Sequence, residues 1–190
     1  MCGRYLFPDE SSRTYITRML SSLRKKGQEP ATGDLVPGSM AAVLALSKQM
    51  KPDAFCMRWG YSLSDGKLVF NSRSESASSK SMFSEGMRSH RCLIPASGYY
   101  EWEKTDNGKR KYLIRPKDED IFFMAGIYRT EDDGAVFSIL TRESSPDIAF
   151  IHDRMPVIFR EKDAGAWLEL SRDADRIIEG AFTEMEYTPQ

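Results

Sequence analysis

The second residue of the chain, Cys2, is a candidate nucleophile. Cysteine is small enough for a preceding initiator methionine to be removed, and removal of Met1 would leave Cys2 with a free α-amine and a thiol on adjacent carbons. Such a 1,2-aminothiol reacts with aldehydes: the amine condenses to a Schiff base, and the thiol closes a thiazolidine ring. The usual pKa of an α-amine, about 7.7–8.0, leaves part of it neutral and nucleophilic at physiological pH. Taken alone, Cys2 is better explained as a small residue at the start of a strand.

A second candidate group is the segment Asn71-Ser72-Arg73-Ser74-Glu75. If it continues the apolar strand expected at 68–70, the side chains of Asn71, Arg73 and Glu75 share one face. An amide, a guanidinium and a carboxylate on one face are suited to holding an oxyanion or a phosphate. Alone, a solvated strand end is the better interpretation of this segment.

The segment Ser97-Gly98-Tyr99-Tyr100-Glu101-Trp102 places a carboxylate inside an aromatic strand. Between Tyr100 and Trp102, Glu101 would be partly desolvated, which would raise its pKa toward the range useful for general acid–base catalysis. The alternative is a glutamate on the solvated face of an edge strand. The two interpretations have equal weight, because glutamate has a low strand propensity and the rest of the strand is apolar.

The segment Ile151-His152-Asp153-Arg154-Met155-Pro156 holds the more promising of the two histidines of the chain. In an extended segment His152 and Arg154 point the same way and Asp153 points the other way. Histidine is the natural proton shuttle near neutrality, and the arginine would anchor a phosphate. The alternative is a histidine in a turn, which is also how we interpret His90.

Together these segments assemble one site with distinct roles: a nucleophile, an oxyanion-holding amide, a buried carboxylate, a histidine and adjacent arginines. The arginines are Arg4, Arg73 and Arg154.

The elements that position this site indicate an α+β fold. Alternating or apolar runs predict a largely antiparallel, curved or barrel-like sheet, and helical spacing predicts a few flanking helices. We expect one domain over residues 1–190, with a helix opened by Pro8 and Asp9 and a terminal helix, or pair of helices, over about 162–178. Asn107-Gly108 and Asp133-Gly134 predict hairpin turns. The strands are expected at 2–7, 40–46, 55–61, 68–70, 92–95, 98–103, 111–114, 121–128 and 135–140.

Composition limits the class of protein. With 190 residues and 41% hydrophobic content, the chain supports one proper core. There is no apolar run of membrane-spanning length and no secretory signal, so we expect a cytoplasmic protein. Three cysteines without metal-type spacing and two histidines argue against a metal site, and no cofactor is expected. A net charge of −1 argues mildly against nucleic-acid binding, so any such site must be a local arginine cluster.

Five segments carry a resemblance to a known family. MCGRY at the start, WGY at Trp59, NSRSES at Asn71, SGYYEW at Ser97 and IHDRMP at Ile151 occur in the order and spacing of the SRAP (SOS response-associated peptidase) family. The resemblance covers nearly the whole chain, and the combination is specific although no single segment is. It implies a compact β-rich α+β domain with a positively charged groove.

The resemblance also implies a function. Members of this family sense abasic sites in single-stranded DNA, form a thiazolidine link to the ring-opened sugar and so shield the lesion from strand cleavage. Cys2 resembles the crosslinking nucleophile, Asn71 the residue that positions the sugar and the N-terminus, and Glu101 the acid/base that also serves release of Met1. His152 resembles the partner that assists Schiff-base chemistry. The positions that match DNA contacts are Arg4, Pro37, Arg73, Thr141 and Arg154.

Two departures from the family pattern bear on DNA binding. Where the family carries Asn-x-Ala-Pro, this chain has Asp34-Leu35-Val36-Pro37, and where many members carry aromatics after WGY it has Ser62-Leu63-Ser64-Asp65-Gly66. Base stacking at the second segment is therefore expected to be reduced.

Three functions remain open from the residues. The first is covalent capture of abasic sites by a monomer that acts on the nucleoid when DNA is damaged. The second is a cysteine peptidase of N-terminal-nucleophile type, in which the amine of Cys2 serves as base for its own thiol. The third is a nucleic-acid binding module without chemistry. The first predicts phosphate contacts and salt-sensitive binding, which the second does not.

Overall fold

The computed structural model describes residues 2–106 and 108–190. The strands are β1 (Tyr5–Leu6), β2 (Asp34–Leu35), β3 (Met40–Leu46), β4 (Pro52–Trp59), β5 (Tyr61–Ser62), β6 (Leu68–Val69), β7 (Asn71–Arg73), β8 (Arg91–Ala96), β9 (Gly98–Thr105), β10 (Gly108–Pro116), β11 (Phe122–Glu131), β12 (Gly134–Glu143), β13 (Arg154–Pro156), β14 (Ile158–Arg160) and β15 (Met185–Pro189). The helices are α1 (Thr14–Lys25), α2 (Ser74–Ala77), α3 (Ser81–Ser89), α4 (Glu161–Leu168) and α5 (Ala174–Glu179).

The larger sheet closes into a barrel. Strands β12, β4, β3, β8 and β11 are hydrogen-bonded in that order, and β11 pairs with β12 to complete the ring. All of these pairings are antiparallel except β12 with β4, which is parallel. Gly126 of β11 lies at a closely packed point of the barrel, because a Cβ atom there would meet Ile94 Cδ1 at 2.5 Å and Cys92 Sγ at 2.9 Å. The expected fold class, α+β with a largely antiparallel, barrel-like sheet, is confirmed.

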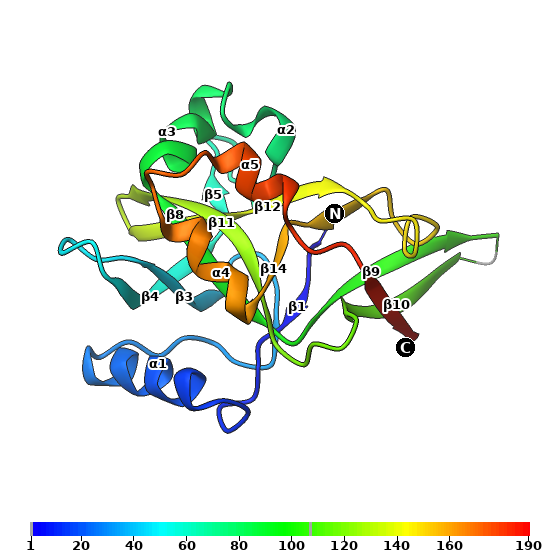
Figure 1. Cartoon of the computed structure of the whole chain (residues 1–190), viewed down its shortest axis with the longest axis horizontal. Helices are drawn as coiled ribbons and strands as arrows, with labels where there is room; N and C mark the ends of the chain where they lie inside the picture. Colours follow the sequence, from blue (N-terminus) through cyan, green and yellow to red (C-terminus); the bar gives the residue numbers. More distant parts are fainter. Residues whose placement is uncertain (1, 107) are drawn as a thin grey trace.

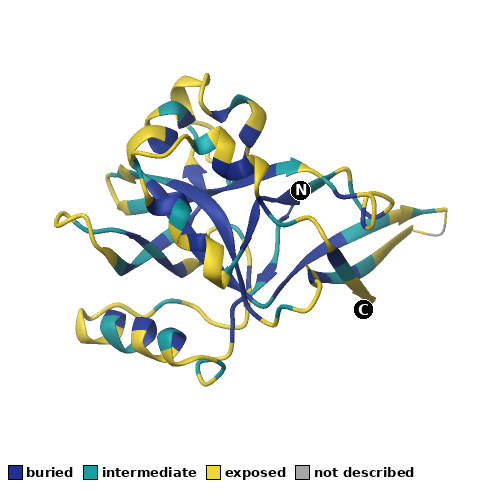
Figure 2. Ribbon diagram, in the orientation of Figure 1, coloured by how far each residue is buried: buried dark blue, intermediate teal, exposed yellow. Residues whose placement is uncertain are grey.

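The second sheet carries the N-terminus of the chain. Its strand order is β15-β10-β9-β1-β2, with every pairing antiparallel. The β9–β10 hairpin extends from the body of the molecule, and β1 runs from the N-terminus down between the two sheets (Figure 1). Tyr5 of β1 packs edge-on against Trp59 of the barrel, with ring centroids 5.2 Å apart, so the N-terminal strand is part of the main core. Figure 2 shows the resulting band of buried residues running through both sheets.

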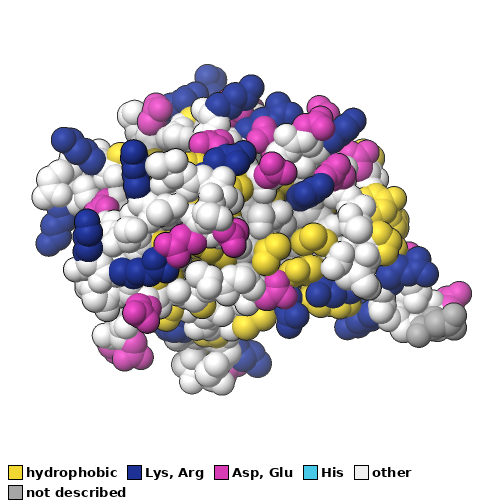
Figure 3. Space-filling view, turned by 90° about the horizontal axis from the view of Figure 1, so that it is seen from below, with side chains coloured by type: hydrophobic (Ala, Val, Ile, Leu, Met, Phe, Trp, Pro, Cys, Tyr) yellow, Lys and Arg dark blue, Asp and Glu magenta, His cyan; other side chains and the backbone are white. Residues whose placement is uncertain are grey.

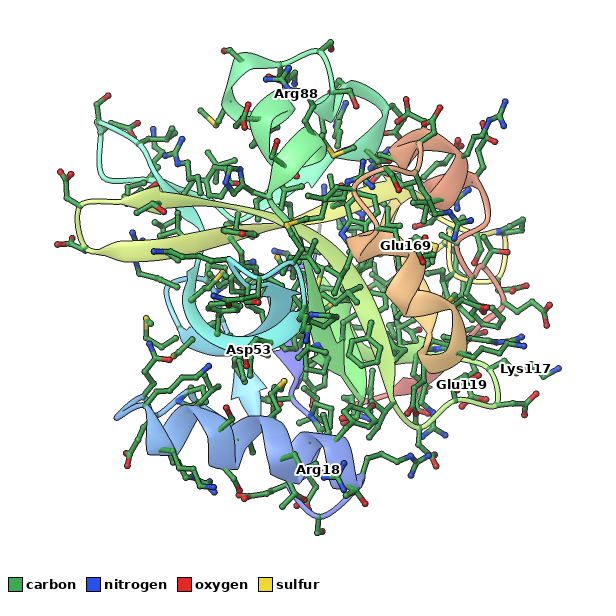
Figure 4. All side chains as sticks on the ribbon, turned by 60° about the vertical axis from the view of Figure 1, so that its left-hand side comes forward. Arg18, Asp53, Arg88, Lys117, Glu119 and Glu169 are labelled. Carbon is green, nitrogen blue, oxygen red and sulfur yellow. The ribbon has the colours of Figure 1, made fainter. Side chains whose placement is uncertain are left out.

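The helices cover the outside of the sheets. In α1 the buried residues Ile16, Met19, Leu20 and Leu23 recur at helical spacing and face the barrel. In Figure 4 the helix, marked by Arg18, lies along the curved sheet with Asp53 of β4 above it; Lys26 at its C-terminal end pairs with Asp53 at 2.9 Å. Beside it lies α4, which ends just before the labelled Glu169; Glu161 at the start of α4 is 4.0 Å from Arg13 at the start of α1. Among the described residues, no helix combines the length and apolarity that crossing a membrane requires.

Several local predictions need correction. The first helix begins at Thr14 and not at Pro8–Asp9. Asp9 instead forms a turn, because its Oδ1 accepts from the Ser11 backbone N at 2.9 Å and its carbonyl accepts from Ser12 N at 3.0 Å. The conditional continuation of the 68–70 strand to Glu75 does not hold: β6 pairs with β5, β7 pairs with β12, and Glu75 belongs to α2.

The hairpins and terminal helices agree with the prediction. Gly134, with φ +120°, opens β12 directly after the β11–β12 turn. Gly108 pairs with Thr105, which places a hairpin at the turn predicted from Asn107-Gly108, although Asn107 itself lies outside the described residues. The terminal helical region is a pair, α4 and α5.

Candidate active site

Cys2 is fully buried at the start of the N-terminal strand segment, with 0% of its surface exposed. Its Sγ donates to the Arg4 backbone carbonyl across 3.7 Å. The Tyr100 backbone N donates to the same carbonyl at 2.9 Å, which holds this segment alongside β9. Burial raises the pKa of the Cys2 thiol above its usual value of 9.0, and the charge of Glu101 raises this pKa further. The thiol is therefore protonated at neutral pH and needs a base before it attacks.

Asn71 fixes the backbone of Cys2. Its Nδ2 donates to the Cys2 carbonyl at 2.8 Å, across 69 positions of sequence. The strand that carries Asn71 is itself anchored on both sides, because the Phe70 carbonyl accepts from Trp59 Nε1 at 2.9 Å and from Ile139 N at 3.0 Å. The other amide atom, Asn71 Oδ1, is buried and accepts no hydrogen bond from the described residues.

Glu101 lies in the middle of β9 and is 4% exposed. Strand β9 lies between β1 and β10, so Glu101 is not on the solvated face of an edge strand. Its charge is close enough to raise the pKa of the Cys2 thiol, after burial the largest influence on that group. The structure thus brings together the thiol, the amide and the carboxylate that the sequence predicted as a set.

Two tyrosines next to Cys2 were not predicted as site residues. Tyr5 and Tyr99 are directly opposite each other on β1 and β9, and both are 0% exposed. Burial raises the pKa of each hydroxyl well above 10.0, and the neighbouring Cys2 raises both further. Neither hydroxyl has a hydrogen-bond partner among the described residues. The signal for them was present in the sequence, since each lies one or two positions from a predicted site residue within an alternating strand.

His152 lies in the loop that leads into β13, with 29% of its side chain exposed. Its Nδ1 accepts from the Arg154 backbone N at 3.0 Å and lies 2.8 Å from Asp153 Oδ1. The prediction that Asp153 points away from His152 is therefore wrong, because the loop turns here and is not extended. These contacts fix the Nδ1 side of the ring within its own loop.

Arg154 is engaged by an acidic partner. Its Nη1 and Nη2 donate to the two oxygens of Glu75 at 2.7 and 2.8 Å, and Nη2 also donates to the Thr141 carbonyl at 2.6 Å. Only 12% of the Arg154 side chain is exposed, against 52% for Glu75. The hydrogen bonds from Arg154 lower the pKa of Glu75, so the pair stays ionised near neutrality. Arg154 is thus partly neutralised before any phosphate arrives.

The remaining predicted DNA contacts differ in how they are presented. Arg73 is exposed at the end of β7, and Arg4 is partly exposed and lies 3.8 Å from Asp34. Pro37 is half-buried in the turn before β3. Thr141 is only 1% exposed and its hydroxyl donates to the Ser72 carbonyl at 3.3 Å. Its observed role is therefore to tie β12 to β7, and its contact with DNA stays a prediction.

One cavity lies apart from this chemistry. It has a volume of about 490 Å³ and lies beyond the other end of β1, between the turn at Asp9, Arg24 of α1 and Asp120. None of the residues proposed for the site lines it. Over residues 2–106 and 108–190, no three His, Cys, Asp or Glu side chains are placed to hold a metal ion. The candidate site is therefore described by its buried reactive groups, Cys2 and Glu101, and by the amide of Asn71.

Comparison with known proteins agrees with this arrangement. The family model of the SOS response associated peptidase (SRAP) matches residues 1–188. The abasic site processing protein YoqW of Bacillus subtilis is 33% identical over 116 residues; the match covers 58% of this chain and 52% of YoqW, so the chain spans about half the length of that relative. The abasic site processing protein YedK of Escherichia coli is 26% identical over 179 residues, covering 88% of this chain and 79% of YedK.

The fold is shared with solved structures as well. A crystal structure of a protein from Bacteroides thetaiotaomicron superposes with a TM-score of 0.80 at 22% identity, covering 99% of this chain and 91% of the other. A likeness at that identity concerns the fold alone, whereas the family model matches nearly every residue of the chain. The chain therefore belongs to the SRAP, or SOS response associated peptidase, family.

Proposed function

We propose that this protein processes abasic sites in single-stranded DNA by linking Cys2 covalently to the sugar, after removal of Met1, and so shields the lesion. Relatives named abasic site processing proteins support the substrate. The observation that carries the mechanism is the 2.8 Å hydrogen bond from Asn71 Nδ2 to the Cys2 carbonyl, which fixes the aminothiol residue beside the charge of Glu101. We place this activity in the cytoplasm, at damaged nucleoid DNA.

The proposed reaction joins two nucleophilic atoms of Cys2 to one carbon. The α-amine attacks the aldehyde carbon C1′ of the ring-opened sugar, and loss of one water gives the imine. The thiol then adds to the imine carbon, its proton passes to the nitrogen, and a five-membered thiazolidine ring is left. The balance is one aldehyde and one aminothiol in, one ring and one water out. Neither oxidant nor metal is required.

The side chains around Cys2 have complementary roles in these steps. Glu101 transfers the proton that the amine loses to the oxygen that departs as water, and it then relays the proton of the thiol, whose pKa is raised, to the imine nitrogen. Asn71 holds the Cys2 backbone so that the amine faces the incoming sugar. His152 assists proton transfer during Schiff-base formation, and burial excludes water that would compete for the imine.

Single-stranded DNA is the expected partner because the thiol is deep in the protein. An abasic nucleotide in a single strand turns out of line without breaking base pairs, whereas one in a duplex is held between its stacked neighbours. Arg73 is exposed at the end of β7, the strand that carries Asn71, and Arg4 is partly exposed two residues after Cys2. We propose both as phosphate contacts of a monomeric protein.

A peptidase of N-terminal-nucleophile type is the second candidate. The description of the family as a peptidase favours it, and release of Met1 is itself the cleavage of an amide adjacent to Cys2 and Glu101. In that case the same thiol attacks an amide carbonyl and the arginines bind a carboxylate.

The deciding experiment mixes the mature protein, with its N-terminus verified by mass spectrometry, with single-stranded DNA that carries one abasic site. On a denaturing gel we expect a retarded band whose mass is that of protein plus DNA minus one water. The band should be absent for Cys2→Ala and for protein that retains Met1. Cys56→Ala is the matched control, because that thiol is half-buried and lies inside the chain, where it has no adjacent α-amine. No adduct with mature protein, combined with hydrolysis of peptides, would move the peptidase to first place.

A further inference from the structure

Three aromatic rings from three separate segments form a cluster at the surface. Tyr112 of β10, Phe150 of the loop before β13 and Tyr187 of β15 meet edge to face, with centroids 5.9 Å (Tyr112–Phe150), 5.6 Å (Tyr112–Tyr187) and 5.1 Å (Phe150–Tyr187) apart. Tyr112 is buried beneath the other two, whereas Phe150 is 50% and Tyr187 44% exposed. We call these three residues the aromatic platform.

The platform is held rigidly. Tyr187 lies on β15, which pairs with β10 over Met185–Pro189, and the Tyr112 hydroxyl donates to Glu103 Oε2 at 2.8 Å. Phe150 is packed against both tyrosine rings. A flat partner would therefore bind with little loss of side-chain freedom, which is the usual advantage of an ordered aromatic surface.

The platform is adjacent to the candidate active site. Tyr112 is directly opposite Glu101 in the β9–β10 register, which places their Cβ atoms about 4.5–5.5 Å apart on one face of the sheet. Phe150 is two residues before His152, so their Cα atoms are at most about 7 Å apart. Stacked nucleotides rise about 3.4 Å each. The platform therefore lies on the same face of the sheet as Glu101, where a nucleotide that neighbours the one held at Cys2 can reach it.

A cation lies beside the platform on the β9–β10 hairpin. Beyond Tyr112 the hairpin carries four cations and two acidic residues, Glu103 and Asp106. Because side chains alternate along a strand, Arg110 is on the platform face and the other three cations are on the opposite face. Arg110 is opposite Glu103 on the platform face. Figure 3 shows hydrophobic side chains gathered on the side of the molecule from which this hairpin extends, with Lys and Arg side chains beside them. The four cations are Lys104, Lys109, Arg110 and Lys111.

We infer that Phe150 and Tyr187 form a stacking site for an unpaired base one or two nucleotides from the abasic sugar. This inference rests on the proposed function and adds a subsite to it. An abasic nucleotide has no base to bind, so the strand must be positioned by its neighbours. An aromatic surface does this for any sequence, because every base has a π face. It also provides stacking that the Ser62–Gly66 segment lacks aromatic residues to supply.

The test uses single-stranded DNA in which a tetrahydrofuran residue replaces the abasic sugar, because this analogue has no aldehyde and reports binding alone. 2-Aminopurine is placed at each of the two positions on either side. We expect its fluorescence to be quenched at one of these positions by wild type and not by Phe150→Ala. Loss of one stacked base should raise the dissociation constant about 5-fold to 150-fold. Phe150→Trp should retain both effects, and Met82→Ala, which removes a partly exposed side chain on α3, should change neither.

Crosslinking to a true abasic site is measured separately with the same proteins. If wild type crosslinks but Phe150→Ala and Tyr187→Ala bind the analogue as wild type does, the platform does not stack a base while the proposed function stands. If wild type neither crosslinks nor binds the analogue, the proposed function fails and the subsite fails with it. If wild type is a dimer that Phe150→Ala converts to monomer, with no change in 2-aminopurine fluorescence, the platform is a self-association surface and the inference is overturned.

Discussion

Replacing Asn71 by alanine is the sharpest test of how the active residue is positioned. The substitution removes the Nδ2 donor that lies 2.8 Å from the Cys2 carbonyl and leaves strand β7 otherwise intact. Cys2 is fully buried, so water does not readily replace the lost donor. The N-terminal residue is then held mainly by its contact with the Arg4 carbonyl and by packing.

The expected magnitude follows from this geometry. A neutral hydrogen bond contributes about 0.5–1.5 kcal/mol net, and a buried carbonyl left without a partner costs about 1–3 kcal/mol. We therefore expect the free energy of unfolding to fall by about 1–3 kcal/mol, which a barrel of this size tolerates. The kinetic effect should be larger, because a displacement of about 1 Å in a reacting group lowers a rate about 100-fold.

The assay is single-turnover crosslinking with protein in excess, with the dissociation constant for the tetrahydrofuran analogue measured in parallel. Asn71→Ala should lower the rate constant at saturating DNA and leave the dissociation constant nearly unchanged, because the amide contacts Cys2. Ser72→Ala is the matched control, since this adjacent buried residue contacts Ser138 instead. A wild-type rate constant for Asn71→Ala at saturating DNA would refute the positioning role.

Three further predictions use charge. Glu101→Gln removes a negative charge and should lower the pKa of the Cys2 thiol, although burial keeps that pKa raised. The same substitution should slow crosslinking at every pH. Thiol alkylation and crosslinking, each measured against pH, test the two expectations, and an unslowed crosslinking rate would contradict the acid–base role. Glu75→Gln should release Arg154 and steepen the salt dependence of DNA binding by about one charge, whereas Arg73→Ala should flatten it by about one; equal slopes for all three proteins would contradict the phosphate contacts. Burial raises the pKa of several thiols and phenols in the folded chain, so the unfolded chain loses these protons first as pH rises above about 9. For each group that titrates in this way, the free energy of unfolding should fall by about 1.4 kcal/mol per pH unit. The urea midpoint should therefore be lower at pH 10 than at pH 8. Groups of this kind include Cys2, Tyr5, Cys92 and Tyr99.

The barrel was predictable in kind but not in its closure. Alternation along β4 and apolar runs along β8, β11 and β12 indicate strands, because side chains of one face recur every second residue. Closure depends on the parallel contact of Val136–Phe137 with Arg58–Trp59, which joins segments far apart in the sequence. No local pattern encodes such a pairing, since it is selected by packing of the whole core.

The same distinction applies to Glu75. Its spacing from Asn71 and Arg73 predicts a shared strand face, but β7 ends at Arg73 and a helical turn follows. The carboxylate instead pairs with Arg154, which is 79 positions away. The sequence predicted both groups near the candidate site but did not predict that they pair with each other.

The sequence by itself determined the candidate reactive set: a cysteine at position 2, the amide of Asn71, the carboxylate of Glu101 and the segment around His152. Residue types and short-range spacing are enough for this, because reactivity is a property of side chains and of strand alternation. Only the tertiary structure decided which of these groups touch, that Thr141 is buried, and that Phe150 and Tyr187 share a surface beside Glu101. Such contacts arise from long-range strand pairing, where the favourable burial of one core selects a single arrangement from many that the local pattern allows.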